Sequence, residues 1–229
     1  MERLNAEERG ADRTRLARPV APARRRGGGG LLLPSRGLGD IGMSETAQDT
    51  STPGRISGAY VADPVHSSFA FSVRYMGVSM FRANFSDVEA RLTADGDDIK
   101  LEGRAKVESI SITTPEQFRA HVLSEEFFDA DKYPYIEFKS TRVQLSDDAT
   151  VEVEGDLTVK GNTVHVTATG TWQGDSPHAF GGERAALQLK ANVDRTQLGL
   201  NWNAPLPTGG NALADEVTLN IDLVLVKES

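Results

Sequence analysis

Four histidines are the side chains most suited to chemistry in this chain, which has no cysteine. They are His66, His121, His165 and His178. No two of them stand at the i, i+4 spacing of a helical zinc site, and without cysteine there is neither a thiolate ligand nor a thiolate nucleophile. We therefore expect no metal site. His66 is expected to make a structural hydrogen bond where a strand begins, and His165 to be solvated.

Charged residues close in sequence are a second source of chemistry. The adjacent Asp194 and Arg195 form either a reactive dyad or a hydrogen-bonded pair that fixes a strand end, and the second interpretation is favoured. Four acids surround the Phe127-Phe128 pair, namely Glu125, Glu126, Asp129 and Asp131. A paired-carboxylate mechanism needs burial that raises a pKa, whereas the spacing of these acids with Lys132 favours a solvated turn.

Sequence motifs of familiar catalytic sites are absent. The chain has no Gly-x-Ser-x-Gly nucleophile elbow, no phosphate-binding glycine loop and no dinucleotide fingerprint. We therefore predict a protein that is not an enzyme, with no catalytic residues and no cofactor. A weaker alternative is a hydrolase or isomerase that acts on a bound lipid through Asp194 and Arg195.

Composition excludes further classes of function. Of 229 residues, 25 are Lys or Arg and 33 are Asp or Glu, which gives a net charge of −8. An acidic chain is a poor partner for a phosphate backbone, so no nucleic-acid binding is expected. No stretch approaches the about 20 apolar residues of a membrane-spanning helix, so no integral membrane segment is predicted.

The first 42 residues differ from the rest in charge. They hold nine arginines against five acids, and the rest of the chain carries a net charge of −12. The apolar run Leu31-Leu32-Leu33 is too short for a secretory signal, which needs roughly 7–15 apolar residues. We predict a disordered extension over residues 1–57, with Met43 as an alternative start. A cytoplasmic location is expected because no convincing signal peptide is present, and export stays open.

From Gly58 onward, apolar and polar residues alternate. The alternating runs cover 68–73, 99–107, 151–159, 163–169, 186–193 and 217–223. Such alternation indicates strands with one buried and one solvated face, and the turn-forming sequences between them indicate antiparallel neighbours. Long runs over 81–93 and 215–228 favour a tall closed barrel over a sandwich. The predicted fold class is therefore all-β.

One segment has helical spacing instead. Phe118 and Val122 share a face within residues 115–124, Thr114 is suited to the N-cap, and Pro115 is suited to the first helical position. We predict one short inserted helix here, which covers the barrel mouth or packs beside it.

Five motifs, in order, resemble those of the YceI-like family of lipid- and polyisoprenoid-binding proteins. They are Asp63-Pro64-Val65-His66-Ser67, the segment from Phe127-Phe128-Asp129 to Pro134-Tyr135-Ile136-Glu137-Phe138, Gly155-Asp156-Leu157-Thr158-Val159-Lys160-Gly161, Asp194-Arg195 with Leu198-Gly199-Leu200, and Asp215-Glu216-Val217. The resemblance spans residues 58–228. It implies one domain, an eight-stranded antiparallel lipocalin-like β-barrel whose lumen holds a long isoprenoid or fatty chain. It also implies a homodimer as one alternative for the assembly.

The chain departs from the family pattern at three places that bear on the ligand. One is Arg82-Ala83-Asn84-Phe85, where the family often has Arg-Gly-x-Phe. Tyr75 precedes Met76-Gly77-Val78-Ser79 where the family commonly has histidine, and Leu198 stands at an aromatic position. These departures affect the head group of the ligand more than the fold. The Tyr75 hydroxyl becomes a candidate for the polar atom that holds a quinone carbonyl.

Aromatic and aliphatic side chains are the candidate ligand-binding residues. They are Phe69, Phe71, Val73, Tyr75, Phe81, Phe85, Phe138, Leu187, Leu189 and Trp202, the last at the end of the penultimate strand. An apolar chain that leaves water gains about 25 cal/mol per Å². We predict binding of a polyisoprenoid, an isoprenoid quinone or a fatty-acyl lipid for sequestration or transport. Alternation is equally compatible with a filled barrel, so the alternative is a stress-related structural or interaction protein with a protein partner.

Overall fold

The computed structural model of the protein describes residues 55–177 and 182–229. Nearly all of the predicted N-terminal extension, with Met43, lies outside these residues, and so does His178.

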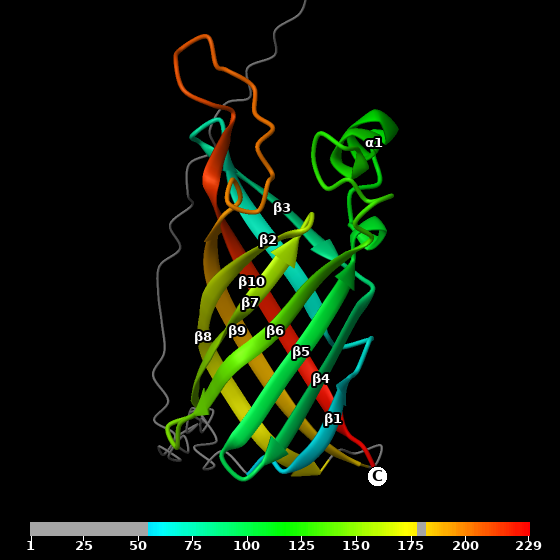
Figure 1. Ribbon diagram of the computed structural model, residues 1–229, viewed down its shortest axis with the longest axis vertical. Coiled ribbons are helices and arrows are strands. Elements are labelled where there is room, and N and C mark those ends of the chain that lie inside the picture. The colour runs from blue at the N-terminus through cyan, green and yellow to red at the C-terminus, as the bar shows by residue number, and fades with distance from the viewer. Residues whose placement is uncertain (1–54, 178–181) are drawn as a thin grey trace, which may run out of the picture. The chain divides into compact units, whose positions relative to one another are not determined.

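Ten strands form one antiparallel sheet that closes on itself (Figure 1). The strands are β1 (Gly58–Ala62), β2 (Ser68–Tyr75), β3 (Ser79–Phe85), β4 (Val88–Asp95), β5 (Asp98–Lys106), β6 (Tyr135–Leu145), β7 (Thr150–Val159), β8 (Asn162–Pro177), β9 (Glu183–Asp194) and β10 (Leu213–Lys227). The ring runs β1-β4-β5-β6-β7-β8-β9-β10, and β10 returns to β1. The prediction of an all-β, eight-stranded antiparallel barrel is confirmed.

Strands β2 and β3 extend this ring at one end. The end of β10 pairs with β1 (Tyr60 opposite Lys227), and its earlier part pairs with β2 (Val73 opposite Val217). Strand β2 then pairs with β3, as β1 pairs with β4. Strands β1 and β2 therefore share one position in the barrel wall, beside successive parts of β10. Strands β4 and β3 share the next position in the same way.

The predicted single strand over residues 81–93 was wrong, because the chain breaks at Ser86-Asp87. The backbone N–H groups of both residues donate to Ser109, to its carbonyl oxygen and its Oγ, at 3.3 and 3.0 Å. The residues that face inward also change parity across the break, from Phe85 to Leu92. An unbroken strand could not bury the inward residues of β3 and those of β4 on the same face, because successive side chains point to opposite faces.

Strand β3 has an edge next to the helical segment. Among the described residues it pairs with no strand other than β2. Its last residues are bonded to the segment after β5, since Ser111 N donates to Asn84 O at 2.8 Å and Phe85 forms a bridge with Ile110. Its first residues contact the helix instead, through the Phe81 and Phe118 rings at 5.9 Å. That part of the barrel wall is held by side chains.

The helix α1 (Glu116–Leu123) confirms the predicted inserted helix, and a short 3-10 helix, η1 (Val107–Ser109), precedes it. The N-cap is Pro115 and not Thr114, so the helix begins one residue later than predicted. Arg119 fixes it by donating to the carbonyl oxygens of Ile110 and Ile112 at 3.1 and 3.0 Å. None of the helices in the described part of the chain is long and apolar enough to cross a membrane.

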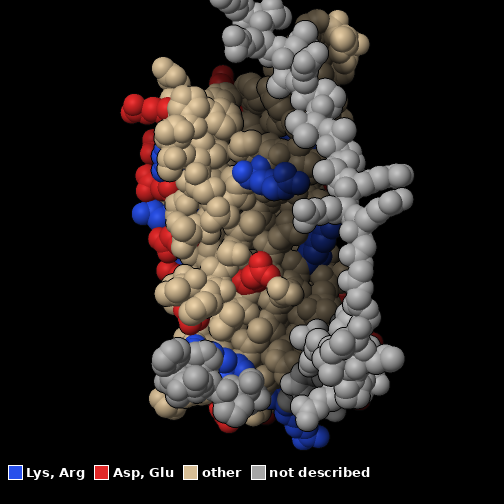
Figure 2. Space-filling view, turned by 180° about the vertical axis from the view of Figure 1, so that it is seen from behind, with Lys and Arg blue, Asp and Glu red and all other residues tan. Residues whose placement is uncertain are grey.

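Charged side chains are unevenly spread over the outer surface. Ion pairs link β4 through β7, for example Glu89 with Arg104 and Glu102 with Lys139, at 2.8 and 3.2 Å. The opposite side, seen in Figure 2, shows few charged residues. Some outward positions of β2 and β10 carry uncharged side chains, such as Ala70 opposite Asn220.

Candidate functional site

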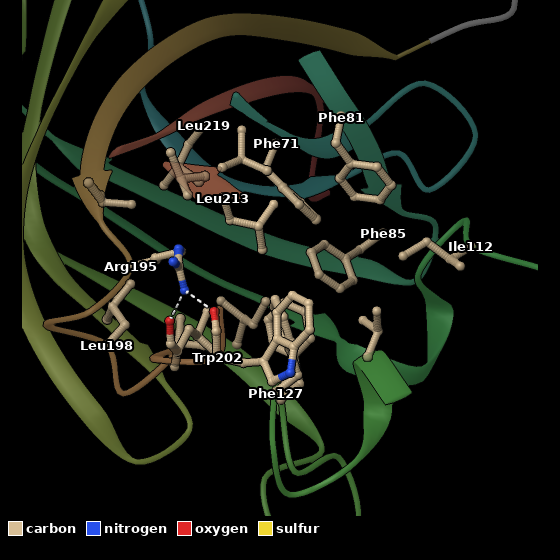
Figure 3. A pocket seen from close by; sticks show the side chains of 18 of the residues that line it. Phe71, Phe81, Phe85, Ile112, Phe127, Arg195, Leu198, Trp202, Leu213 and Leu219 are labelled. Atoms are coloured by element: carbon tan, nitrogen blue, oxygen red, sulfur yellow. Dashed lines mark hydrogen bonds between the residues drawn. The ribbon is translucent and has the colours of Figure 1, made fainter. Parts of the chain in front are cut away.

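An apolar cavity of about 280 Å³ lies inside the barrel, at the end that carries α1. Strands β2 and β3, helix α1 and the segment between β9 and β10 supply most of its wall. Figure 3 shows Phe71, Phe81 and Phe85 on one side, with Trp202 and Phe127 across from them. Phe118 and Tyr75, which are 39% and 42% exposed, border its opening.

The aromatic wall follows from the pairing of β2 with β3. Phe69 stands opposite Phe85 with ring centroids 5.5 Å apart, and Phe71 lies 5.9 Å from the same ring. Opposite Phe71 on β3 is Ala83, the small residue between Phe81 and Phe85. The cavity is therefore lined by ring faces and edges over the length of this hairpin.

A second, smaller cavity of about 90 Å³ lies deeper in the barrel. Phe69, Leu157 and Leu219 border both cavities, with Ile136 as a fourth shared residue. Phe138 belongs to the deeper one and reaches it because Gly155 faces it from β7. A Cβ atom at Gly155 would lie 2.5 Å from the Phe138 ring, so glycine is required there. The two cavities together mark a discontinuous apolar path along the barrel axis.

Arg195 is the charged residue of the cavity wall and is 3% exposed. Its guanidinium donates to the carbonyl oxygens of Leu200 and Trp202, the latter at 2.9 Å (Figure 3). It also donates to the carbonyl oxygen of Ala214 at 2.9 Å and to the Asp215 carboxylate at 3.2 Å. Burial lowers the pKa of Arg195, and the negative charges of Asp215 and Asp194 oppose that shift. Arginine stays protonated in proteins, so the guanidinium keeps all of its N–H donors.

Asp194 does not bond to Arg195. Its carboxylate accepts from the Thr196 hydroxyl at 2.6 Å and from the Thr196 N–H at 2.9 Å, and these hydrogen bonds lower the pKa of Asp194. The two residues thus fix the turn after β9 independently. This arrangement supports the structural interpretation of the pair over the reactive one.

His121 projects from α1 to the cavity wall. Its ring lies edge-on to Trp202, with centroids 4.8 Å apart, and 6.0 Å from Phe127. Its Nδ1 is 3.1 Å from an oxygen of Glu126. Its Nε2 is buried and has no hydrogen-bond partner among the described residues.

The other described histidines lie away from both cavities. His66 Nδ1 is 3.0 Å from the Asp63 carboxylate in the turn before β2, as expected for a structural contact. His165 is on the outer face of β8 and contacts Asp156. Within residues 55–177 and 182–229, no three acids or histidines are grouped in a way that would hold a metal ion.

Comparison with known proteins places this barrel in a family. Residues 60–225 match the family model described as the YceI-like domain. The chain belongs to the YceI-like family.

Relatives and solved structures agree with that assignment. A UPF0312 protein of Pseudomonas putida is 28% identical over 166 residues, which are 71% of this chain and 82% of that protein. The crystal structure of BcnA from Burkholderia cenocepacia has a TM-score of 0.59 at 20% identity and covers 71% of this chain and 98% of its own. A polyisoprenoid binding domain from Saccharophagus degradans has a TM-score of 0.57 at 12% identity, with 75% and 99% covered. At these identities the solved structures establish the fold alone.

The YceI-like barrel brings most of the candidate ligand-binding residues together. Seven border the larger cavity: Phe69, Phe71, Val73, Tyr75, Phe81, Phe85 and Trp202. Phe138 and Leu189 border the deeper one, and Leu187, which is fully buried, borders neither. Trp202 does not end a strand as predicted, because β9 ends at Asp194 and the ring is carried by the loop that Arg195 fixes.

Several wall residues of this YceI-like cavity were not predicted from the sequence. They include Ile112, Phe127, Phe128, His121 and Leu200. For His121 a signal was available, since Phe118, His121 and Val122 stand at i, i+3 and i+4 and share one face of a helix. Most of the others lie in loops, where no repeat indicates which way a side chain points.

Replacing Phe69 with alanine should join the two cavities. The Phe69 ring borders both of them, so its removal lengthens the continuous apolar space. We expect the variant to shift from shorter to longer isoprenoid chains in competitive binding, measured by mass spectrometry of the bound fraction. Phe138→Ala is the matched control, because it enlarges only the deeper cavity. An unchanged chain-length preference in Phe69→Ala would show that Phe69 does not separate the two cavities.

Proposed function

We propose that this protein binds a long apolar chain in the barrel lumen, for sequestration or transport. The candidate ligands are a polyisoprenoid, an isoprenoid quinone or a fatty-acyl lipid. The observation that carries the proposal is the cavity of about 280 Å³, enclosed by aromatic and aliphatic side chains and bordered at its opening by α1. A related domain described as polyisoprenoid binding has the same fold, which supports this ligand class.

The energetics of such a site favour a chain-shaped ligand. Each Å² of apolar surface removed from water contributes about 25 cal/mol, so a chain that buries a few hundred Å² binds without many polar contacts. Drug-sized ligands occupy pockets of about 300–1,000 Å³, so the larger cavity, at about 280 Å³, is just below that range. A longer chain would extend past Phe69 toward the deeper cavity.

The alternative of a filled barrel with a protein partner is less well supported. A filled barrel needs side chains that occupy the whole interior, and the interior contains two apolar cavities. A protein partner would need an exposed apolar surface. Exposed large apolar residues do occur, for example Val78 at 85%, but Val78 stands in the β2–β3 turn. We favour the ligand-binding function on this basis.

The test is to purify the protein under native conditions from its own host and to analyse it by native mass spectrometry. We expect a mass increment that disappears after organic extraction, together with an isoprenoid or fatty lipid in the extract. The same spectra report the subunit number, which tests the homodimer alternative. An unliganded mass in every preparation, with no uptake of added polyprenol, quinone or fatty acid, would contradict the proposal.

A further inference from the structure

The larger cavity is almost wholly apolar, so its few polar groups decide which head group it accepts. Four bordering side chains among the described residues carry such a group: Tyr75, His121, Arg195 and Trp202. An apolar chain gains affinity from the walls, whereas a buried polar atom gains only from a matching partner.

Arg195 is not available to a ligand. Three carbonyl oxygens and the Asp215 carboxylate already take hydrogen bonds from its guanidinium. Tyr75 is 42% exposed at the opening, so water competes there for its hydroxyl. The indole of Trp202 has one N–H donor and no acceptor, so it cannot accept a hydrogen bond from a ligand.

His121 differs from these three in that its Nε2 atom is buried without a partner in the described part of the chain. Glu126 lies beside the other ring nitrogen of His121. A carboxylate oxygen lies 3.1 Å from Nδ1 and favours the tautomer with the proton on Nδ1. The Nε2 atom of the neutral ring then has a lone pair and can only accept a hydrogen bond.

The direction of the ring is fixed by its neighbours. The rings of Trp202 and Phe127 contact the imidazole edge-on, with centroids 4.8 and 6.0 Å from the imidazole centroid. Arg195 holds the loop that carries Trp202, through the Trp202 carbonyl at 2.9 Å. The imidazole ring therefore lies in an aromatic corner of the cavity wall.

We propose that His121 Nε2 accepts a hydrogen bond from the hydroxyl group of the ligand, so that the cavity selects an isoprenoid alcohol or phenol. A quinone carbonyl, an ether or a hydrocarbon has no proton to donate, and an ionised carboxylate would set its oxygen against the lone pair. This inference rests on the proposed function, since it names the head group of the same ligand.

The test compares farnesol with farnesyl methyl ether, which have the same chain and differ in the one donor hydrogen. Affinities are measured by displacement of an apolar fluorescent probe, N-phenyl-1-naphthylamine. We expect the wild-type protein to bind farnesol roughly fivefold to tenfold more tightly than the ether. In His121→Leu the ratio of the two affinities should fall to about one, whatever the absolute affinity of the variant for the ether. His165→Leu, on the outer face, is the matched control and should keep the wild-type preference.

A second measurement on the wild-type protein does not depend on the folding of a variant. The ¹⁵N resonance of Nε2 should shift on addition of farnesol and stay in place on addition of the ether. If farnesol and the ether bind equally, or if His121→Leu keeps the preference, the inference is overturned and the proposed function stands. If neither compound nor the probe binds, the proposed function itself fails.

Discussion

Replacing Arg195 with alanine is expected to lower the free energy of unfolding by roughly 3 kcal/mol. Arg195 is 3% exposed, and its guanidinium bonds to carbonyl oxygens of the Leu200–Trp202 loop and of β10. Its loss leaves these buried acceptors without donors, and each such acceptor costs about 1–3 kcal/mol unless water replaces the donor. Chemical denaturation followed by circular dichroism measures the change.

Two variants separate the geometry of Arg195 from its charge. Arg195→Lys keeps the charge without the planar fork of donors, so we expect it to recover only a minor part of the stability. Arg142→Ala removes an exposed partner of Glu154 and should have little effect. A denaturation midpoint of Arg195→Ala equal to that of the wild type would show that the loop does not depend on Arg195.

Filling the lumen should abolish binding of the apolar chain. Leu219 is buried and borders both cavities, so Leu219→Trp places an indole where the chain would lie. Overpacking a filled core costs about 1–3 kcal/mol, but here the added volume enters empty apolar space. We therefore expect a folded barrel with at least tenfold weaker probe binding, and no lipid after native purification.

The control for this variant adds the same bulk outside the barrel. Asn220 is the next residue on β10 and points outward, so Asn220→Trp should keep wild-type binding. Leu219→Trp protein that still retains lipid would indicate that the ligand lies elsewhere. Measuring the thermal midpoint of both variants excludes unfolding as the cause of a loss.

The two-residue period of the strands explains how far the sequence could predict the cavity. On β2 and β3 the pattern places Phe69, Phe71, Phe81 and Phe85 on one face, and these residues do line the cavity. The same pattern reveals the break in the predicted 81–93 strand, because inward parity changes between Phe85 and Val88. Alternation thus states which face a residue occupies.

Alternation does not state how well neighbours fill the space in front of a residue. Leu187 faces inward like Leu189, but it stands opposite Trp172 and Leu223, and these side chains close that level of the barrel. Filling depends on residues from strands far apart in sequence. Trp202 was predicted as a wall residue but at a strand end, and Phe127 was not predicted, because both lie in loops. The loop of Trp202 is positioned by contacts such as the bond from Arg195 to the Trp202 carbonyl.

Beside α1, β3 pairs with no other strand of the described residues, and this arrangement affects the kinetics of the protein. Beside α1, the barrel wall is held by the contact of Phe81 with Phe118 and by the Arg119 bonds, without a strand ladder. A chain that enters there displaces one eight-residue helix and breaks no pairing between strands. The residence time of the ligand and the unfolding rate of the barrel should therefore vary independently. A substitution that loosens α1 would speed release while the barrel stays as long-lived as before.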